Sequence, residues 1–148
     1  MFCGILKKKG VTNMGIVTNV SDAYQKCIDA CSRCAQACYE CFEACLNEAD
    51  IQARANCIKM LVECARMCEM SVAGMSANAQ FSKPHCALCA TVCDGCAKEC
   101  SMFQDAHCQN ARRSARTAQM SAETCRAWYK GDENKARMIN AGLNLTHY

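Results

Sequence analysis

Cysteine recurs with a helical period along the first third of the chain. Residues 21–47 contain no glycine or proline, and the positions that would face inward in a helix are all cysteine. Successive cysteines lie four, three, four, three and four residues apart, at Cys27, Cys31, Cys34, Cys38, Cys41 and Cys45. Because a helix turns once in about 3.6 residues, this spacing places the thiols on one stripe. We predict a helix with Ser21 as its N-cap and an end near Asn47.

A second helix is predicted after the polar residues 47–50, with Asp50 as its N-cap and an end near Ser76. Its inward positions mix cysteine with ordinary core residues, at Cys57, Leu61, Cys64, Cys68, Ser71 and Met75. This helix is therefore expected to add three thiols to the same interior.

A third helix is predicted to begin at Ser82, because Pro84 is tolerated in the first turn of a helix. Its cysteines repeat the spacing of the first segment, at Cys86, Cys89, Cys93, Cys96 and Cys100. The stripe continues through Phe103 to His107, and a break is expected near Asp105.

The fourth predicted helix runs from about Cys108 to Tyr129. Lys130 and Gly131 resemble a basic last turn followed by a C-cap glycine, which predicts that the helix ends there. Its inward positions are cysteine at the two ends and alanine between them, at Cys108, Ala111, Ala115, Ala118, Ala122 and Cys125.

Four such helices joined by short connections predict an all-α fold. We expect an antiparallel up-down-up-down four-helix bundle with a cysteine-lined core over residues 21–130. Residues 131–148 are expected to form a C-terminal tail, in which Ala136, Ile139 and Leu143 favour a short docked helix.

Residues 1–20 have two interpretations. The segment is disordered, its run of lysines being solvated. Alternatively, part of it is not translated, because Lys8, Lys9 and Gly10 permit a purine-rich ribosome-binding sequence ahead of a start at Met14.

Composition makes the cysteines the feature to explain. The chain has 17 cysteines among 148 residues, with one proline and seven glycines. A net charge of +3 is too small to favour nucleic acid or an anionic membrane as a partner. No long apolar run or secretory leader pattern is present, so we expect a cytoplasmic protein, in which disulfides are rare. Metal binding is the leading use of the thiols, and no motif indicates an enzyme.

Charge separates the metals that thiolates select. Tetrahedral zinc with four cysteines per ion, or several iron–sulfur clusters, leaves much uncompensated negative charge in a buried core. Cu(I) ions that each take two bridging thiolates give a neutral core with about one copper per cysteine. Multiple Cu(I) ions are the expected cargo. An iron–sulfur electron-transfer protein and a zinc or soft-metal binding protein are the alternatives.

The expected ligands are the inward cysteines and one histidine. His107 continues the stripe of the third helix beside Cys108, whereas the methionines, Met75 among them, are interpreted as flexible core filling. The candidate metal ligands are Cys27, Cys31, Cys34, Cys38, Cys41, Cys45, Cys57, Cys64, Cys68, Cys86, Cys89, Cys93, Cys96, Cys100, His107, Cys108 and Cys125. Burial favours protonated thiols before loading, so the apo bundle is expected to be folded.

The cysteine spacing of the first and third helices, followed by His107 and Cys108, resembles the cysteine-rich four-helix-bundle copper storage proteins of the cytosolic branch. The resemblance covers about residues 21–125. It implies Cu(I) storage in the core, uptake at one end of the bundle with His107 as a ligand, and a homo-oligomer, a tetramer of bundles. In an antiparallel bundle Cys45, Cys57, Cys100, His107 and Cys108 would surround that end. A copper chaperone or efflux protein is the kind of partner that such a store implies.

The fourth helix departs from this family pattern. Cytosolic relatives usually carry cysteine at the positions equivalent to 111, 115, 118 and 122, where this chain has alanine. The lost ligands are expected to shorten the copper chain, to shift it toward the other three helices or to favour a bulkier cluster. Cys125 is a candidate replacement ligand.

Overall fold

Four α-helices make up the described part of the chain. This computed structural model describes the backbone of residues 22–140 and the side chains of residues 24–127. The helices are α1 (Asp22–Leu46), α2 (Ala55–Ser76), α3 (Ser82–Cys100) and α4 (Ala106–Asn140). No strand occurs among residues 22–140, and the predicted all-α fold is confirmed.

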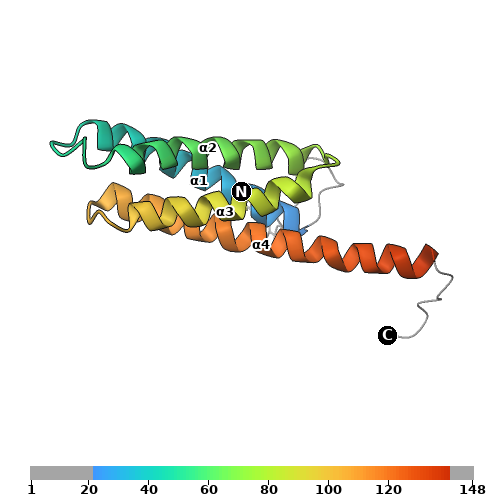
Figure 1. The fold of residues 1–148 in the computed structure, drawn as a ribbon. Helices are drawn as coiled ribbons and strands as arrows, with labels where there is room; N and C mark the ends of the chain where they lie inside the picture. Colours follow the sequence, from blue (N-terminus) through green and yellow to red (C-terminus); the bar gives the residue numbers. More distant parts are fainter. Residues whose placement is uncertain (1–21, 141–148) are drawn as a thin grey trace, which may run out of the picture.

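The helices run alternately up and down. Each packs against its neighbour in the chain, and α1 closes the bundle against α4. Figure 1 shows the α1–α2 and α3–α4 connections at one end of the bundle and the α2–α3 turn at the other. In the same view the C-terminal end of α4 extends beyond the other helices. The antiparallel topology therefore brings the segment after Cys45 to the segment before Cys108, as expected.

Thiols and alanines, rather than large aliphatic side chains, fill the interior. Every cysteine from Cys27 to Cys125 is at most 2% exposed, and Leu61 and Met75 are the largest side chains buried to this degree. The inward face of α4 consists largely of fully buried alanine. Because an uncharged thiol packs as a small apolar group, this core needs no metal to be buried.

Helix α2 begins later than the sequence predicted. Residues 51–54 form turns, the helix starts at Ala55, and no side chain caps it at Arg54. Asp50 is therefore not the N-cap. Its carboxylate accepts a hydrogen bond from Arg54 Nε at 2.6 Å instead. A charged pair across one turn has replaced the expected bond from a side chain to the backbone.

The turn between α2 and α3 has the predicted position. Helix α3 begins at Ser82, whose hydroxyl donates to the carbonyls of Gly74 at 2.9 Å and Ala79 at 2.8 Å. Asn78 has a φ of 48°, the left-handed conformation that asparagine tolerates at the end of a helix. Ser82 thus ties the start of α3 to the last turn of α2.

Helix α4 is longer than the sequence predicted. It begins at Ala106, two residues before Cys108, and continues through Gly131 to Asn140, so the predicted end at Gly131 is wrong. A glycine inside a helix costs about 1 kcal/mol, and the strong helix formers that follow it offset this cost. The predictions for Ser21, for residues 1–20 and for residues 141–148 lie outside the described residues.

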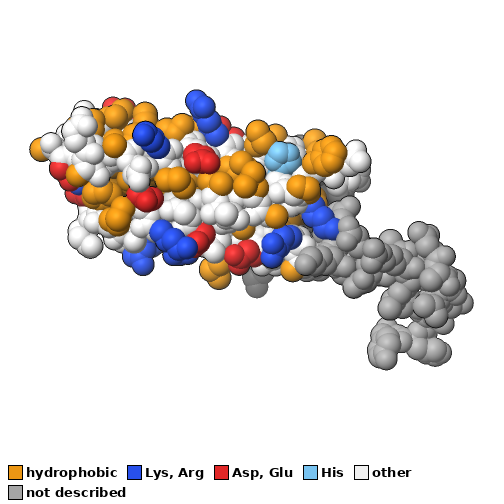
Figure 2. Space-filling view, viewed as in Figure 1, with side chains coloured by type: hydrophobic (Ala, Val, Ile, Leu, Met, Phe, Trp, Pro, Cys, Tyr) orange, Lys and Arg blue, Asp and Glu red, His pale blue; other side chains and the backbone are white. Residues whose placement is uncertain are grey.

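One face of the bundle carries charges of both signs. Figure 2 shows acidic and basic side chains interspersed with apolar ones over the face in view. Among the described helices, none has the length and apolarity that crossing a bilayer requires. The distinctive chemistry of this chain lies in its interior.

Candidate metal centre

The described region contains sixteen free cysteines, all of them buried. Their sulfur atoms approach one another at 3.7–3.9 Å, both within helices and between them. The helical spacing read from the sequence explains this: an inward residue on every turn of α1 and α3 stacks thiols along the bundle axis. The site is therefore a column of sulfur rather than a single pocket.

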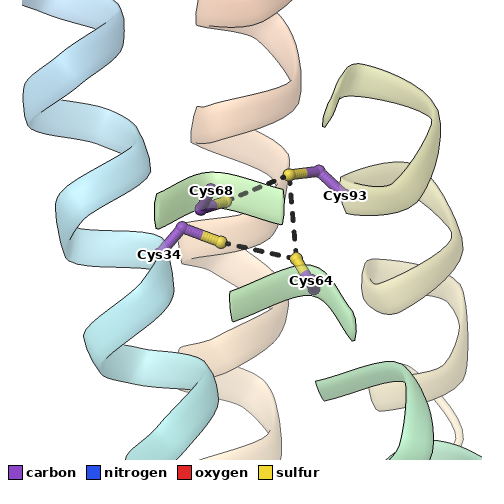
Figure 3. A group of neighbouring side chains, drawn as sticks. All are labelled: Cys34, Cys64, Cys68 and Cys93. Carbon is purple, nitrogen blue, oxygen red and sulfur yellow. Dashed lines mark hydrogen bonds between the residues drawn. The ribbon is translucent and has the colours of Figure 1, made fainter. Parts of the chain in front are cut away.

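The middle of this column holds a four-thiol group. Figure 3 shows Cys34 of α1, Cys64 and Cys68 of α2, and Cys93 of α3 pointing toward one another. Cys93 Sγ lies 3.7 Å from both Cys64 Sγ and Cys68 Sγ, and Cys34 Sγ lies 3.8 Å from Cys64 Sγ. All four sulfur atoms lie within 4.8 Å of one another. Small movements of these side chains would bring all four sulfur atoms within bonding distance of one metal ion.

Neighbouring groups share members with this one. Cys64 also belongs to a group with Cys38 and Cys96, and Cys68 to a group with Cys31 and Cys89. These three groups are therefore continuous with one another. A thiolate in it can bridge two ions, which is the arrangement that a high ratio of metal to cysteine requires.

The column ends in a group that includes a histidine, beside the α1–α2 and α3–α4 connections. Cys41, Cys45, His107 and Cys108 present ligand atoms within 4.8 Å of one another. We call this group the mouth. Cys108 Sγ lies 3.7 Å from Cys41 Sγ and 3.8 Å from Cys45 Sγ. The sequence also predicted Cys57 and Cys100 at this end of the bundle. Their Sγ atoms lie 3.8 Å from each other.

His107 has an unpaired ring nitrogen at the mouth. Its side chain is 22% exposed, and Nε2 lies 3.8 Å from Glu48 Oε1, which is too far for a hydrogen bond. Nε2 itself is buried and has no hydrogen-bond partner among the described residues. A buried nitrogen without a partner costs free energy, so His107 is suited to bind a metal ion at this end.

Arg54 is a residue of the candidate site that our sequence analysis missed. Its side chain is buried at the mouth, where Nη1 lies 3.7 Å from Cys108 Sγ and 2.8 Å from Asp105 Oδ2. The guanidinium carbon lies 4.6 Å from the centre of the Phe103 ring. Arg54 stands three residues before Cys57, in register with the inward stripe of α2. That register was the signal that could have identified it.

The thiols of the mouth differ in acidity. Burial is the largest influence on Cys45 and raises its pKa to about 11. Burial likewise raises the pKa of Cys108. Hydrogen bonding from Cys100 outweighs burial at Cys41 and lowers its pKa to about 7. Cys41 is therefore the first of these three thiols to ionise as the pH rises.

The far end of the column holds the other α4 thiol. Cys27 of α1, Cys86 of α3 and Cys125 of α4 lie within 4.8 Å of one another. Cys125 donates a weak hydrogen bond to the thioether of Met75, with Sγ 3.9 Å from Sδ. The four inward alanines of α4 that separate Cys125 from Cys108 are fully buried, at Ala111, Ala115, Ala118 and Ala122.

Comparisons with known proteins agree with this geometry. The family model described as copper storage protein matches residues 20–130. The uncharacterized cysteine-rich protein YhjQ of Bacillus subtilis (strain 168) is 38% identical over 73 residues, which are 49% of this chain and 65% of that protein. The chain thus spans slightly less than two thirds of this curated relative.

Two solved structures share the fold. The Cu(I)-bound copper storage protein BsCsp3 is 36% identical with a TM-score of 0.64, covering 71% of this chain and 96% of its own. A cytosolic copper storage protein from Streptomyces lividans, in a structure with five coppers, is 32% identical with a TM-score of 0.68. That match covers 72% of this chain and 93% of the Streptomyces chain.

Proposed function

This chain belongs to the copper storage protein family, and from that membership we propose that it stores multiple Cu(I) ions in the thiol-lined core of its bundle. The observation that carries the proposal is the column of sulfur atoms, in which the three central groups share Cys64 and Cys68. A store needs many equivalent sites in a small volume, and shared thiolates supply them. The role is binding and release of an ion, and no catalytic step is assigned.

Charge balance supports Cu(I) over other thiophilic ions. Each Cu(I) that replaces the proton of one thiol leaves the core neutral, even when every thiol has reacted. Tetrahedral zinc brings two positive charges to four thiolates and leaves a net negative charge in the same volume. Replacement of thiol protons by Cu(I) therefore adds no net charge to the buried core.

The ligand set that we propose consists of the buried thiols and one imidazole. The three-helix arrangement around Cys34, Cys64, Cys68 and Cys93 supports bridging in the middle of the column. The full set is Cys27, Cys31, Cys34, Cys38, Cys41, Cys45, Cys57, Cys64, Cys68, Cys86, Cys89, Cys93, Cys96, Cys100, His107, Cys108 and Cys125.

Uptake is proposed to occur at the mouth. His107 is partly exposed there, while the thiols behind it are fully buried. An ion bound first by the imidazole and the more acidic Cys41 can pass to Cys45 and Cys108, whose sulfur atoms lie within 4 Å of one another. Each transfer then exchanges one ligand at a time.

We further propose a cytoplasmic location, a homo-oligomeric state such as a tetramer, and exchange of copper with a chaperone or an efflux protein. The Streptomyces relative is described as cytosolic, which supports the first of these. Fractionation of the native cells, and light scattering on the purified full chain, test the location and the oligomer separately.

The test of storage is an anaerobic titration of the reduced apo protein with Cu(I) against a coloured competing chelator. We expect the protein to withhold about ten ions or more per chain, since each thiolate can bridge two ions. A parallel titration with Zn(II) is expected to give a much smaller number, set by four thiolates per ion. Only a few bound Cu(I) ions, or a brown protein after anaerobic purification, would contradict the proposal and favour an iron–sulfur protein.

A further inference from the structure

We propose that the end of the bundle opposite the mouth holds a mixed thiolate–thioether site, in which Met75 binds Cu(I) together with Cys27, Cys86 and Cys125. We call these four residues the far-end site. The inference rests on the proposed Cu(I) function and adds a ligand of a different chemical kind to it. Met75 then serves as a metal ligand as well as a core residue.

Four buried sulfur atoms, one from each helix, meet at this end of the bundle. Cys27, Cys86 and Cys125 come from α1, α3 and α4, and their sulfur atoms lie within 4.8 Å of one another. Met75 lies in the last turn of α2, is fully buried, and places Sδ 3.9 Å from Cys125 Sγ. α2 provides no cysteine beyond Cys68, so its sulfur at this end is the thioether.

The hydrogen bond between Cys125 and Met75 places the thioether sulfur beside a thiol of the far-end site. In the apo protein the Cys125 S–H donates to Met75 Sδ. When Cu(I) binds, it takes the place of this proton, which is released to solvent. The lone pair of Sδ then faces the ion.

A thioether also suits the charge of this site. Three thiolates around a single Cu(I) carry an excess of two negative charges, unless they bridge to further ions. A fourth ligand that is neutral and soft strengthens binding without adding to that excess. At the tip of the column Cys86 and Cys125 have fewer neighbouring sulfur atoms with which to bridge than the thiols of the four-thiol group.

A buried hydroxyl one helical turn away provides an independent observation. Ser71 lies on the inward face of α2 between Cys68 and Met75 and is 1% exposed. Its Oγ has no hydrogen-bond partner among the described residues. An unpaired buried hydroxyl destabilises the apo protein, but it becomes a donor once a neighbouring thiol is a thiolate. The thiol that shares this face of α2 with Ser71, three residues away, is Cys68.

Methyl NMR of the full chain tests the inference directly. The protein is labelled with [methyl-¹³C]methionine and titrated anaerobically with Cu(I), while the chelator assay counts the bound ions. The Met75→Leu variant identifies the Met75 signal and removes the sulfur at nearly constant volume. We expect the Met75 methyl signal to shift as the last ions bind, and Met75→Leu to withhold one ion fewer than the wild type.

Met60→Leu is the matched control. Met60 lies on the same helix, but its methyl group packs toward Gly95 of α3. Its signal is expected to stay in place, and the variant is expected to hold the full number of ions. A crystal structure of the loaded wild-type chain gives a second measurement that needs no variant, because it shows whether an ion lies within bonding distance of Met75 Sδ.

The outcomes separate this inference from the proposed function. Many bound ions with an unmoved Met75 signal, or a loaded crystal structure with no ion at Sδ, would overturn the far-end site and leave storage intact. A full ion count in Met75→Leu would overturn it as well. Failure of the wild-type chain to bind Cu(I) would overturn both proposals together.

Discussion

Arg54 Nη1 lies 3.7 Å from Cys108 Sγ, so a permanent cation faces the thiols at the mouth. The same guanidinium pairs with Asp50 and Asp105, one from each of the connections that meet at this end. Arg54 therefore joins the α1–α2 connection to the start of α4 and covers the outer end of the sulfur column.

Arg54→Met is expected to destabilise the apo protein by about 1–2 kcal/mol. The variant removes both ion pairs and the contact with Phe103, but Asp50 and Asp105 are partly exposed and can be hydrated again, which limits the loss. Urea unfolding measures the change. Arg116→Met is the control, since it removes a more exposed pair, with Asp94, and should cost less than Arg54→Met. An equal decrease in the free energy of unfolding in both variants would contradict a structural role for the buried Arg54 side chain.

His107→Ala is expected to slow Cu(I) uptake while reducing the final count by about one ion. The imidazole is the partly exposed ligand of the mouth, and the thiols behind it remain in place. Stopped-flow transfer from a coloured Cu(I) chelator measures the rate. His85→Ala alters a half-buried histidine near the far end and should leave the rate unchanged. A large fall in the final count would show that His107 organises more of the core than the mouth.

Ala115→Cys is expected to raise the number of bound Cu(I) ions by about one. Ala115 is fully buried on the inward face of α4, so a thiol there joins the column from its fourth side. The added sulfur must be accommodated in a packed core, at a cost of about 1–3 kcal/mol in the apo protein. Ala115→Ser controls for packing, because it has nearly the same shape but no thiolate. An unchanged count in Ala115→Cys would indicate that the ions lie away from α4.

Ser71→Ala is expected to stabilise the apo protein by about 1 kcal/mol, which is the reverse of most core substitutions. The variant removes a buried hydroxyl that has no hydrogen-bond partner among the described residues. Ser32→Ala is the comparison, since the exposed Ser32 hydroxyl donates to the Ile28 carbonyl and its removal should be nearly neutral. Destabilisation by Ser71→Ala would mean that the hydroxyl already has a partner, such as a water molecule.

The apo protein is expected to lose stability as the pH rises from about 9 to about 11. Burial raises the pKa of Cys45 from 9.0 to about 11, so in this interval the folded chain keeps a proton that the unfolded chain has lost. The stabilisation that the raised pKa of Cys45 gives the folded protein is complete below pH 9. It is lost as the pH rises through the pKa that Cys45 has in the folded state. Cys108 changes in the same direction. Urea midpoints of the reduced protein measure the effect, and midpoints that rise across this interval would contradict it.

The periodic part of the sequence determined what could be predicted. Cysteine at every inward position of α1 and α3 specifies both the helices and the side that faces the core, and the structure confirms both. The ends of α2 and α4 could not be predicted as well, because caps compete with other local interactions. Asp50 pairs with Arg54, and the residues that follow Gly131 include the strong helix formers Glu133, Lys135 and Ala136.

Arg54 and Met75 show a different limit of sequence analysis. Each occupies an inward register position, but a lone arginine or methionine on a stripe is usually a surface or core residue. Their relation to the thiols emerges only when α3 and α4 close the bundle and bring Cys108 and Cys125 to them. Contacts between helices that are far apart in the sequence therefore determine the surroundings of Arg54 and Met75.

The closeness of the thiols has a further consequence, which concerns oxidation. Cys64 and Cys93 belong to different helices, and their sulfur atoms lie 3.7 Å apart, whereas a disulfide bond is about 2.0 Å long. An oxidant that reached this pair could join α2 to α3 covalently and remove two ligands. Burial of every described cysteine to 2% exposure or less is the protection that the empty bundle has. Bound Cu(I) would occupy the same sulfur atoms, so that the cargo and the fold together preserve the thiols on which both depend.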